Sequence, residues 1–421
     1  GRCVYLMKNM LKVIVFCYSF TIPLFFIATE TAQGAYYVSP DGSDESGGTI
    51  ESPWKTIQYA VNQAESGDVI NVRGGIYKEM VVISEKQAKD DQLITIQNYP
   101  YEKPILDAEG IEITSSNRAG FEIINSQGIR IKGFEIRNVK ADGRKLFPAG
   151  ILVRGSNNHI EIVDNDIHHV ANYADKGNAH GILVYGDQPQ AIQNIKIMKN
   201  RLHDLTLGRS ESLTLSGNVQ HFTIEGNIVS RNNNIGIDIA GRYGACESDG
   251  CTDYARDGVI SNNIVSNISS GDNPAYKGYK SAAGIYVDGG QNIVIKNNYV
   301  SKSDYGISLS SEKEGYSAKN ISIIGNYIAK NTKAGLVIGG SGADKGGVEN
   351  SDIVNNLFSF NDRSIEGFRE ITIQHHTRGN KFSGNVYYVC GSEEYINIPK
   401  KVTAENRFID ESVYPRALCK K

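Results

Sequence analysis

The chain has 421 residues, with 44 glycines, 10 prolines and a formal net charge of −3. This length allows a large hydrophobic core in one or two domains. A net charge so close to zero provides no polybasic surface, which argues against nucleic acid as a partner and against any partner held by charge alone.

The amino end has the pattern of a secretory signal peptide. From Met7, two lysines precede an apolar run, and small residues follow it in the arrangement typical of a cleavage site. We expect cleavage before Ala35, which makes residues 1–34 a leader. The apolar run ends at Thr29 and is shorter than the roughly 20 residues that span a bilayer. We therefore expect a secreted or periplasmic protein that contacts no membrane after signal cleavage.

A short helix is expected next, after Ser52 and Pro53. The segment places its apolar side chains on one helical face, namely Trp54, Ile57, Ala60, Val61 and Ala64. Such a face indicates a helix that covers one end of a stack, where core and paired backbone would otherwise be exposed. We assign residues 35–95 to an amino-terminal cap and the first coils.

Internal repeats dominate the rest of the chain. A frame of the form x1-Gly-Ile-x4-Val-x6-Gly recurs with small variations in AGILVRG (149–155), HGILVYG (180–186), ESLTLSG (211–217), IGIDIAG (235–241), AGIYVDG (283–289), YGISLSS (305–311) and AGLVIGG (334–340). A second series of aliphatic strands ends at turns that carry Asn165, Asn200, Asn227, Asn263, Asn298, Asn326 and Asn356. These asparagines are spaced from 27 residues (200 to 227) to 36 residues (227 to 263) apart, so each repeat holds two or three short strands.

Short alternating strands with an asparagine at one fixed corner predict an all-β chain that winds in coils. Each strand then pairs with its copy about 4.8 Å above, and the asparagines can hydrogen-bond along the stack. A leucine-rich or helical solenoid is disfavoured, because no apolar residues recur at helical spacing within the repeats. We therefore predict a parallel β-helix over residues 96–390, followed by a carboxyl-terminal cap at 391–421.

The strings YYVSPDGSDESGGTIESPWKTIQYAV and GDVINVRGGIY resemble the amino-terminal cap of secreted right-handed parallel β-helix proteins of the pectate-lyase-like superfamily. The coils resemble that superfamily as well, so the likeness covers residues 36–390. It implies a right-handed β-helix (solenoid) with a short capping α-helix. The superfamily contains lyases, hydrolases, epimerases and adhesins, so the resemblance does not assign catalytic residues.

Two aspartates stand out in the repeated frame. Residues at x3 and x5 point into the coil and those at x4 and x6 point outward, because side chains alternate along a strand. Asp238 occupies x4 of one coil and Asp288 x6 of the next, so their Cα atoms are expected roughly 8 Å apart on one outer face. The same stripe supplies further catalytic candidates: Tyr286, Glu312, His180 and Glu211. The alternative readings are a solvated surface aspartate and, for His180, a hydrogen bond at a coil corner.

Two long loops are expected to flank this stripe, at residues 242–258 and 268–283. Long loops in a compact fold are usually functional or disordered. They supply two further catalytic candidates, Arg256 and Lys280, and four candidate substrate-binding residues, Tyr243, Tyr254, Tyr276 and Tyr279. Tyrosine rings stack on sugars, and arginine or lysine suits an acidic sugar, so the loops predict a glycan groove. Self-packed lids are the alternative.

Two chemistries suit such a groove. In a polysaccharide lyase, Asp238 and Asp288 would bind Ca²⁺ at a uronate carboxylate, and Arg256, Lys280 or Tyr286 would remove the C5 proton. In an inverting glycoside hydrolase, one carboxyl group donates a proton and another activates water, with the two roughly 6.5 to 9.5 Å apart. A noncatalytic glycan-binding or surface β-helix is a third alternative. Our first choice is a monomeric lyase that cleaves an extracellular, uronate-containing polysaccharide by β-elimination.

Four cysteines remain after cleavage, and an exported chain can pair them. We predict one disulfide between Cys246 and Cys251 and another between Cys390 and Cys419. A metal site is the alternative, but no histidine stands at ligand spacing near either pair.

Overall fold

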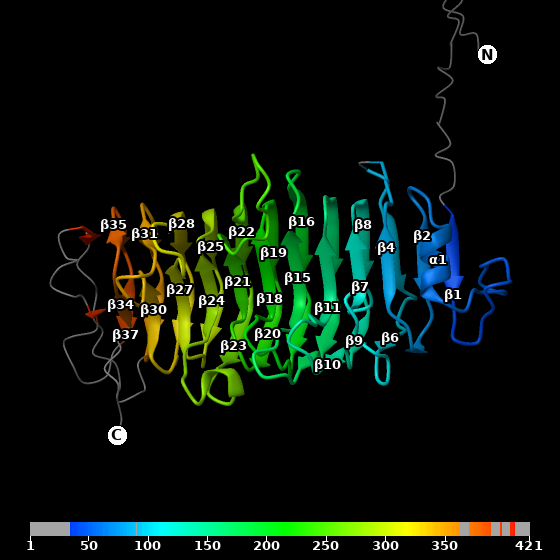
Figure 1. Ribbon diagram of the computed structural model, residues 1–421, viewed down its shortest axis with the longest axis horizontal. Helices are drawn as coiled ribbons and strands as arrows, with labels where there is room; N and C mark the ends of the chain where they lie inside the picture. The colour runs from blue at the N-terminus through cyan, green and yellow to red at the C-terminus, as the bar shows by residue number, and fades with distance from the viewer. Residues whose placement is uncertain (1–33, 90, 362–369, 389–395, 398–404, 409–421) are drawn as a thin grey trace, which may run out of the picture. The chain divides into compact units, whose positions relative to one another are not determined.

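The repeats fold as the coils of a right-handed parallel β-helix (Figure 1). The computed structural model describes residues 34–89, 91–361, 370–388, 396–397 and 405–408. Within these residues the strands form three long sheets of 11, 15 and 11 strands, and the strands pair in parallel from coil to coil. The predicted fold class is confirmed.

Sheet I contains β4 (Val81–Ser84), β7 (Ala119–Ile124), β11 (Ala149–Arg154), β15 (His180–Gly186), β18 (Leu213–Gly217), β21 (Ile237–Ala240), β24 (Ala283–Asp288), β27 (Tyr305–Ser310), β30 (Ala334–Ile338), β34 (Ile371–Ile373) and β38 (Ile396–Asn397). Sheet II contains β1 (Ala35–Val38), β2 (Val69–Val72), β5 (Ile94–Asn98), β8 (Gln127–Lys132), β12 (Asn158–Val163), β16 (Ile192–Met198), β19 (Val219–Glu225), β22 (Arg256–Ser261), β25 (Gln291–Lys296), β28 (Ser317–Ile324), β31 (Gly347–Glu349), β32 (Asp352–Val354), β35 (Thr377–Arg378), β36 (Lys381–Ser383) and β39 (Arg407–Phe408). Sheet III contains β3 (Gly75–Tyr77), β6 (Pro104–Asp107), β9 (Glu135–Arg137), β13 (Asp166–His168), β17 (Arg201–His203), β20 (Ile228–Asn232), β23 (Ile264–Ile268), β26 (Tyr299–Ser301), β29 (Tyr327–Ala329), β33 (Leu357–Ser359) and β37 (Val386–Tyr388). A separate pair is formed by β10 (Lys140–Ala141) and β14 (Ala171–Asn172).

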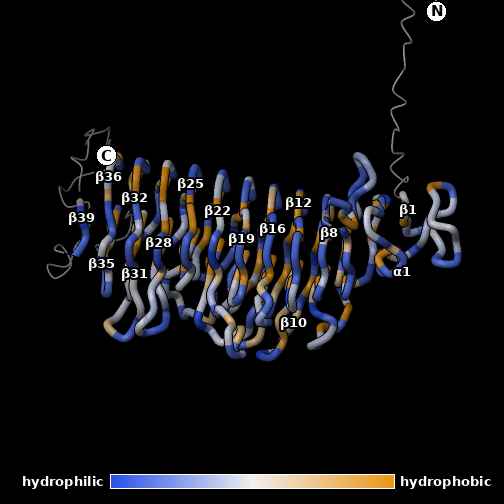
Figure 2. The backbone as a smooth tube through the Cα atoms, turned by 90° about the horizontal axis from the view of Figure 1, so that it is seen from above, coloured by the Kyte–Doolittle hydropathy of each residue, from blue (hydrophilic) through white to orange (hydrophobic). Residues whose placement is uncertain are grey.

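The core fills the interior of the coils because side chains alternate along every strand. Ile237 and Ile239 of β21 lie directly beside Ile285 and Val287 of β24, and all four are fully buried. Hydrophobic and hydrophilic residues alternate in the same way along the strands of sheet II (Figure 2). The positions x3 and x5 therefore point inward, as predicted.

The turn asparagines between sheets II and III form a hydrogen-bonded ladder. Asn200 donates through Nδ2 to the carbonyl of Ile162 at 2.9 Å and to Asn227 Oδ1 at 3.0 Å. The same arrangement links the asparagines from Asn165 to Asn385. It satisfies polar groups that a sharp buried turn would otherwise leave without partners, and it confirms the predicted ladder.

The predicted helix is α1 (Ile57–Gln63), which lies at the amino end of the stack beside β1 and β2 (Figure 1). The side chain of Thr56 caps it by accepting a hydrogen bond from the backbone N–H of Tyr59 at 3.2 Å. Its buried face packs against β1, β2 and β4. Across the part of the chain that the structure describes, no helix combines the length and apolar character needed to cross a membrane.

A disulfide joins Cys246 to Cys251 in the loop between β21 and β22, as predicted. The other predicted disulfide, between Cys390 and Cys419, lies outside the described residues. The predicted leader, residues 1–34, also lies outside them except for Gly34, so export stays a prediction.

The inward and outward faces of sheet I can be tested by a pair of substitutions. Ile285→Ala should lower the free energy of unfolding by roughly 2–5 kcal/mol, because it leaves a cavity in the coil interior. Ser308→Ala, at an outward position two coils further along than Asp238, should change it by less than about 0.5 kcal/mol. Urea unfolding of both variants measures the difference, and equal losses would mean that the faces are wrongly assigned.

Candidate active site

Outward-facing residues of sheet I form a row across the middle coils. Thr214 of β18, Asp238 of β21 and Tyr286 of β24 are direct neighbours in register, and Asp288 lies two positions further along β24. Asp238 is 3 % exposed and Asp288 is 2 % exposed. The alternative of solvated surface aspartates is therefore wrong, because loops cover the row.

The covering loops are the two long ones. The first joins β21 to β22 and brings the hydroxyl of Tyr243 to Asp288, to which it donates a hydrogen bond. The second joins β23 to β24 and includes the 3-10 helix η1 (Pro274–Tyr276). The hydroxyl of Tyr276 accepts a hydrogen bond from Asn234 Nδ2 at 3.0 Å. Each loop thus places one of the predicted tyrosines close to the row.

Three carboxyl groups meet beneath these loops. Thr214 Oγ1 donates to Glu211 Oε2 at 2.9 Å, and the backbone N–H of Glu312 donates to Asp288 Oδ1 at 2.9 Å. Asp238 lies close enough to Glu211 for the two charges to interact. Its Oδ1 is buried and has no hydrogen-bond partner among the described residues.

Burial raises the pKa values of all three carboxyl groups. It raises the pKa of Asp238 well above the usual range, and the charges of Glu211 and Asp288 add to this effect. Burial also raises the pKa of Glu211. It raises the pKa of Asp288 to about 7, although the hydrogen bonds from Tyr243 and from the Glu312 N–H oppose the shift. Near neutral pH the cluster therefore keeps protons that ordinary carboxylates have lost.

Other predicted residues contact the cluster from its edges. The hydroxyl of Tyr286 donates to Glu312 Oε1 at 2.9 Å. His180 Nδ1 lies 3.1 Å from Thr214 Oγ1. Because that hydroxyl donates its proton to Glu211, His180 is the donor in this contact. Burial lowers the pKa of His180 to about 4, so its ring is uncharged at neutral pH.

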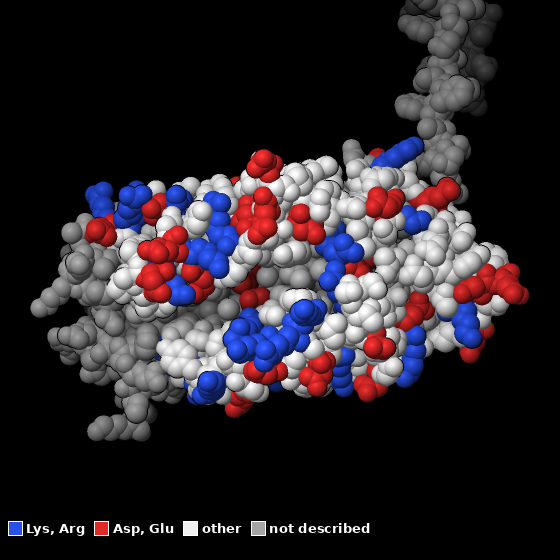
Figure 3. All heavy atoms as spheres, viewed as in Figure 1, with Lys and Arg blue, Asp and Glu red and all other residues white. Residues whose placement is uncertain are grey.

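A cavity of about 600 Å³ opens on this outer face of sheet I, with Glu211 and Asp238 among its lining residues. Figure 3 shows the face hollowed in its middle, with acidic side chains at the base and Lys and Arg side chains along its lower margin. The cavity is also lined by residues that the sequence analysis did not select: Arg118, Phe147, Arg154, Tyr185 and Arg209. Arg154 and Tyr185 occupy x6 of their frames, the slot of Asp288, so the repeat itself contained a signal for both.

Of the predicted site residues, His180, Glu211, Asp238 and Tyr243 line the cavity, and four others lie away from the carboxyl cluster. Arg256 begins β22 in sheet II. Its guanidinium donates hydrogen bonds to Asn218 Oδ1 and to Gln220 Oε1, at 3.0 Å each. Tyr254 packs its ring against the guanidinium of Arg242, at 4.7 Å from Cζ to the ring centroid. Lys280 and Tyr279 are exposed on the second loop. The structure therefore does not bring these four together with the carboxyl groups.

The predicted calcium ligands were Asp238 and Asp288. Both oxygens of Asp288 accept hydrogen bonds, one from Tyr243 and one from the backbone of Glu312. Asp238 is buried, and its Oδ1 has no hydrogen-bond partner among the described residues. Calcium requires six to eight oxygen ligands, and within the described ranges no three His, Cys, Asp or Glu side chains are arranged to hold a metal ion. Ca²⁺ binding by Asp238 and Asp288 stays a prediction.

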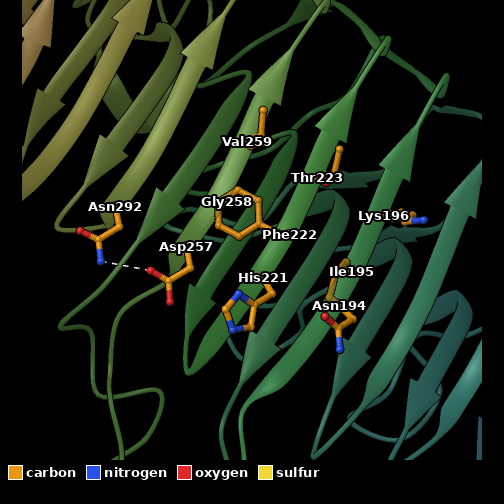
Figure 4. A pocket seen from close by; sticks show the side chains of 10 residues that line it. All are labelled: Asn194, Ile195, Lys196, His221, Phe222, Thr223, Asp257, Gly258, Val259 and Asn292. Carbon is orange, nitrogen blue, oxygen red and sulfur yellow. Dashed lines mark hydrogen bonds between the residues drawn. The ribbon is translucent and has the colours of Figure 1, made fainter. Parts of the chain in front are cut away.

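A second depression, of about 480 Å³, lies on the outer face of sheet II. Figure 4 shows Asn194, His221 and Asp257 on successive strands there, with Asn292 Nδ2 donating to Asp257 Oδ1 at 3.1 Å. It is lined by single polar side chains and contains no group of buried carboxyls. The cavity on sheet I is therefore the candidate active site.

Comparison with known proteins agrees with the fold. A model of the Pel9A-like right-handed β-helix region matches residues 36–185. The uncharacterized protein YwoF of Bacillus subtilis is 38% identical over 370 residues, which cover 88% of this chain and 78% of YwoF. The chain belongs to the pectate-lyase-like β-helix family. The resemblance found in the sequence is confirmed.

Solved structures show the same fold at low identity. A lacto-N-biosidase from Eubacterium ramulus has a TM-score of 0.59 at 16% identity, over 90% of this chain and 67% of that protein. The pectate lyase Pel9A has a TM-score of 0.51 at 15% identity, over 87% of this chain and 79% of the lyase. At these identities the likeness establishes the architecture, and the activity has to be inferred from the site.

The raised pKa of Asp288 predicts a pH-dependent effect on stability. Asp288 has a folded pKa of about 7, against about 4 for an unfolded aspartate. The folded protein therefore loses stability as the pH rises from about 4 to about 7, because it must release a proton from a buried site. Asp288→Asn removes this titration, so at pH 8 the variant should be more stable than the parent by on the order of 1–4 kcal/mol.

Urea unfolding at pH 5 and pH 8 measures this difference. Asp352→Asn, at an exposed position of sheet II, is the matched control and should not change its stability relative to the parent between the two pH values. A difference between Asp288→Asn and the parent that stays constant with pH would contradict the raised pKa.

Proposed function

We propose that the cavity on sheet I binds a polysaccharide and hydrolyses its glycosidic bonds, with carboxyl groups as acid and base. The observation that carries this proposal is a cluster of three buried carboxyl groups with raised pKa values, two of which, Glu211 and Asp238, line an open cavity. Such groups can hold and release protons near neutral pH, which is what acid–base cleavage of a glycosidic bond requires.

We assign the role of general acid to Asp238. It is the carboxyl group whose protonated form is favoured by burial and by both acidic neighbours. Its buried Oδ1, without a hydrogen-bond partner among the described residues, belongs to a side chain that lines the cavity. Glu211 lines the cavity together with Asp238, and its charge favours the protonated form of Asp238.

We assign the role of general base to Asp288. The hydroxyl of Tyr243 and the backbone N–H of Glu312 donate to its two oxygens, and both bonds favour its charged form. In the reaction, a water oxygen bonds to the anomeric carbon while the bond to the leaving oxygen breaks. Asp288 takes a proton from the water, and Asp238 gives a proton to the leaving oxygen. The Cα atoms are expected roughly 8 Å apart, a spacing that allows the carboxyl separation of about 6.5–9.5 Å used by inverting enzymes.

β-Elimination is the second candidate. It is supported by the match to the Pel9A-like region and by the arginines that line the cavity, which can neutralise a uronate carboxylate without a metal. It ranks second because two of the bases expected for it, Arg256 and Lys280, lie away from the carboxyl groups. The third, Tyr286, donates its hydroxyl proton to Glu312, and burial raises its pKa.

The products decide between these reactions. Incubation with a panel of extracellular polysaccharides should release reducing ends without the absorbance of unsaturated uronates, and EDTA should leave the rate unchanged. Unsaturated ends would establish the lyase instead. Binding of a glycan without any turnover across the panel would favour a noncatalytic glycan-binding β-helix.

The two assigned residues can be tested separately. Asp238→Asn and Asp288→Asn should each lower kcat by at least about a hundredfold, the low end for loss of a positioned acid or base. Both variants should keep the circular dichroism spectrum of the parent, because Asn has the size and shape of Asp and neither side chain belongs to the hydrophobic core. Asp352→Asn should retain the activity of the parent. Full activity of both site variants on a substrate that the parent degrades would place the chemistry elsewhere on the helix.

A further inference from the structure

The cavity has two chemically different ends. The acid end is formed by Glu211 and Asp238. At the other end lie Arg118 and Arg154. The x6 slots from β11 to β21 run in register through Arg154, Tyr185, Ser216 and Ala240, so three coil steps separate β11 from the strand of Asp238. At about 4.8 Å per step, the two ends are roughly 14 Å apart.

A buried carboxylate holds the arginine end in place. Glu122 is 2 % exposed and accepts hydrogen bonds from Arg154 Nε at 2.7 Å and from Arg118 Nη2 at 3.3 Å. Each contact uses one edge of a guanidinium, and the side chain of Arg154 is 34 % exposed in the cavity wall. Arg118 Nε is buried and has no hydrogen-bond partner within the described part of the chain. An unpartnered buried donor beside a cavity indicates a place for an acceptor group of a ligand.

Two arginines share one carboxylate at this end, because Arg118 and Arg154 both pair with Glu122. Asp187 also lines the cavity. Asp187 already accepts a hydrogen bond through Oδ1 from the backbone N–H of the glycine after Arg154, at 3.0 Å. The remaining guanidinium N–H groups of Arg118 and Arg154 can therefore bind an anionic group.

An apolar floor lies between the two ends. Leu152 of β11 and Leu183 of β15 are neighbours in register at x4, and they pack with the small side chain of Ala149. The ring of Tyr185 packs against this cluster, and Phe147 is 39 % exposed beside it. Such a surface suits the apolar faces of sugar rings and carries no charge of its own.

We propose that the Arg118–Arg154 end is a subsite for an anionic group of the glycan, about three coil steps from the bond that is cleaved, and that the acid end binds an uncharged sugar. This inference rests on the proposed function for the location of the cleaved bond. A cluster of carboxyl groups offers no positive charge to a uronate, whether it is protonated or ionised, whereas the arginine end does.

The arrangement selects a class of substrate. A glycan made only of uronates would place a carboxylate against Glu211 and Asp238, which disfavours it. A glycan in which neutral sugars separate the acidic groups satisfies both ends. The anionic group is a carboxylate, or a sulfate or phosphate ester with the same chemistry at the arginines.

Binding tests this inference without requiring turnover. The full chain carrying Asp238→Asn is titrated calorimetrically with an oligosaccharide in which galacturonate alternates with a neutral sugar, and with the same oligosaccharide after reduction of its carboxyl groups. The acidic form should bind at least about tenfold more tightly, a difference of about 1.4 kcal/mol. A sulfate ester of the reduced form distinguishes the two sources of charge, since tight binding of that probe alone would assign the subsite to an ester.

Substitutions locate the subsite. Arg154→Gln should reduce the ratio of the two affinities to near one by weakening only the acidic probe, and Arg154→Lys should restore part of it. Arg130→Gln is the matched control, because Arg130 also pairs with a carboxylate, Glu161, at 3.2 Å, but on sheet II. Equal affinities of the parent for all three probes, or equal weakening of acidic and reduced probes by Arg154→Gln, would overturn the subsite.

These outcomes separate the two proposals. If the protein binds the acidic probe more tightly than the reduced probe but cleaves no polysaccharide, the anionic subsite is supported and the hydrolase proposal is wrong. Cleavage of neutral and acidic glycans at the same rate, with equal affinities, keeps the hydrolase and rejects the subsite.

Discussion

Parallel, in-register pairing of each coil with the next is the constraint on which the rest of the structure depends. It places Ile237 beside Ile285 in the core, and it equally places Asp238 beside Tyr286 on the outer face. A coil that slipped by one residue would turn its aliphatic side chains outward and its polar ones inward. The register that aligns the core residues of neighbouring coils therefore also aligns the residues of the groove. No separate set of contacts is needed to align them.

The sequence predicted those parts of the molecule that repeat. The inward isoleucines, the asparagine ladder and the capping helix all follow from local periodicity, which the chain carries in its own residues. It did not predict the burial of Asp238 and Asp288, because burial depends on how two long loops lie over the strands. Arg256 was misplaced relative to the acids for a related reason: loop length does not reveal where the next strand of sheet II begins. Arg118 precedes its strand and has no place in the frame, so the repeat could not indicate it.

The buried carboxyl cluster lowers the stability of the fold at the place where the proposed chemistry occurs. Burying Glu211, Asp238 and Asp288 together costs folding free energy, because each charge loses water and repels the others. A β-helix can tolerate this cost, since dozens of fully buried aliphatic residues in neighbouring coils hold the strands in place. A scaffold with a smaller core would have less stability to spare for such a site. The same rigidity keeps the acids at fixed separations, which acid–base chemistry requires.

The disulfide joins Cys246 to Cys251, which lie 5 positions apart in the sequence, and so closes a short loop. Closing so short a loop removes little freedom from the unfolded chain, so by the chain-entropy account it contributes less to the stability of the whole fold than a long-range disulfide would. Its effect is local: with Asp253, which accepts hydrogen bonds from the backbone N–H groups of Gly244 and Cys246, it stiffens the wall that carries Tyr243. The redox state of the surroundings therefore acts on the groove through this wall and leaves the stack of coils intact. A thiol reductant would affect Asp288 only indirectly, by loosening the tyrosine that donates a hydrogen bond to it.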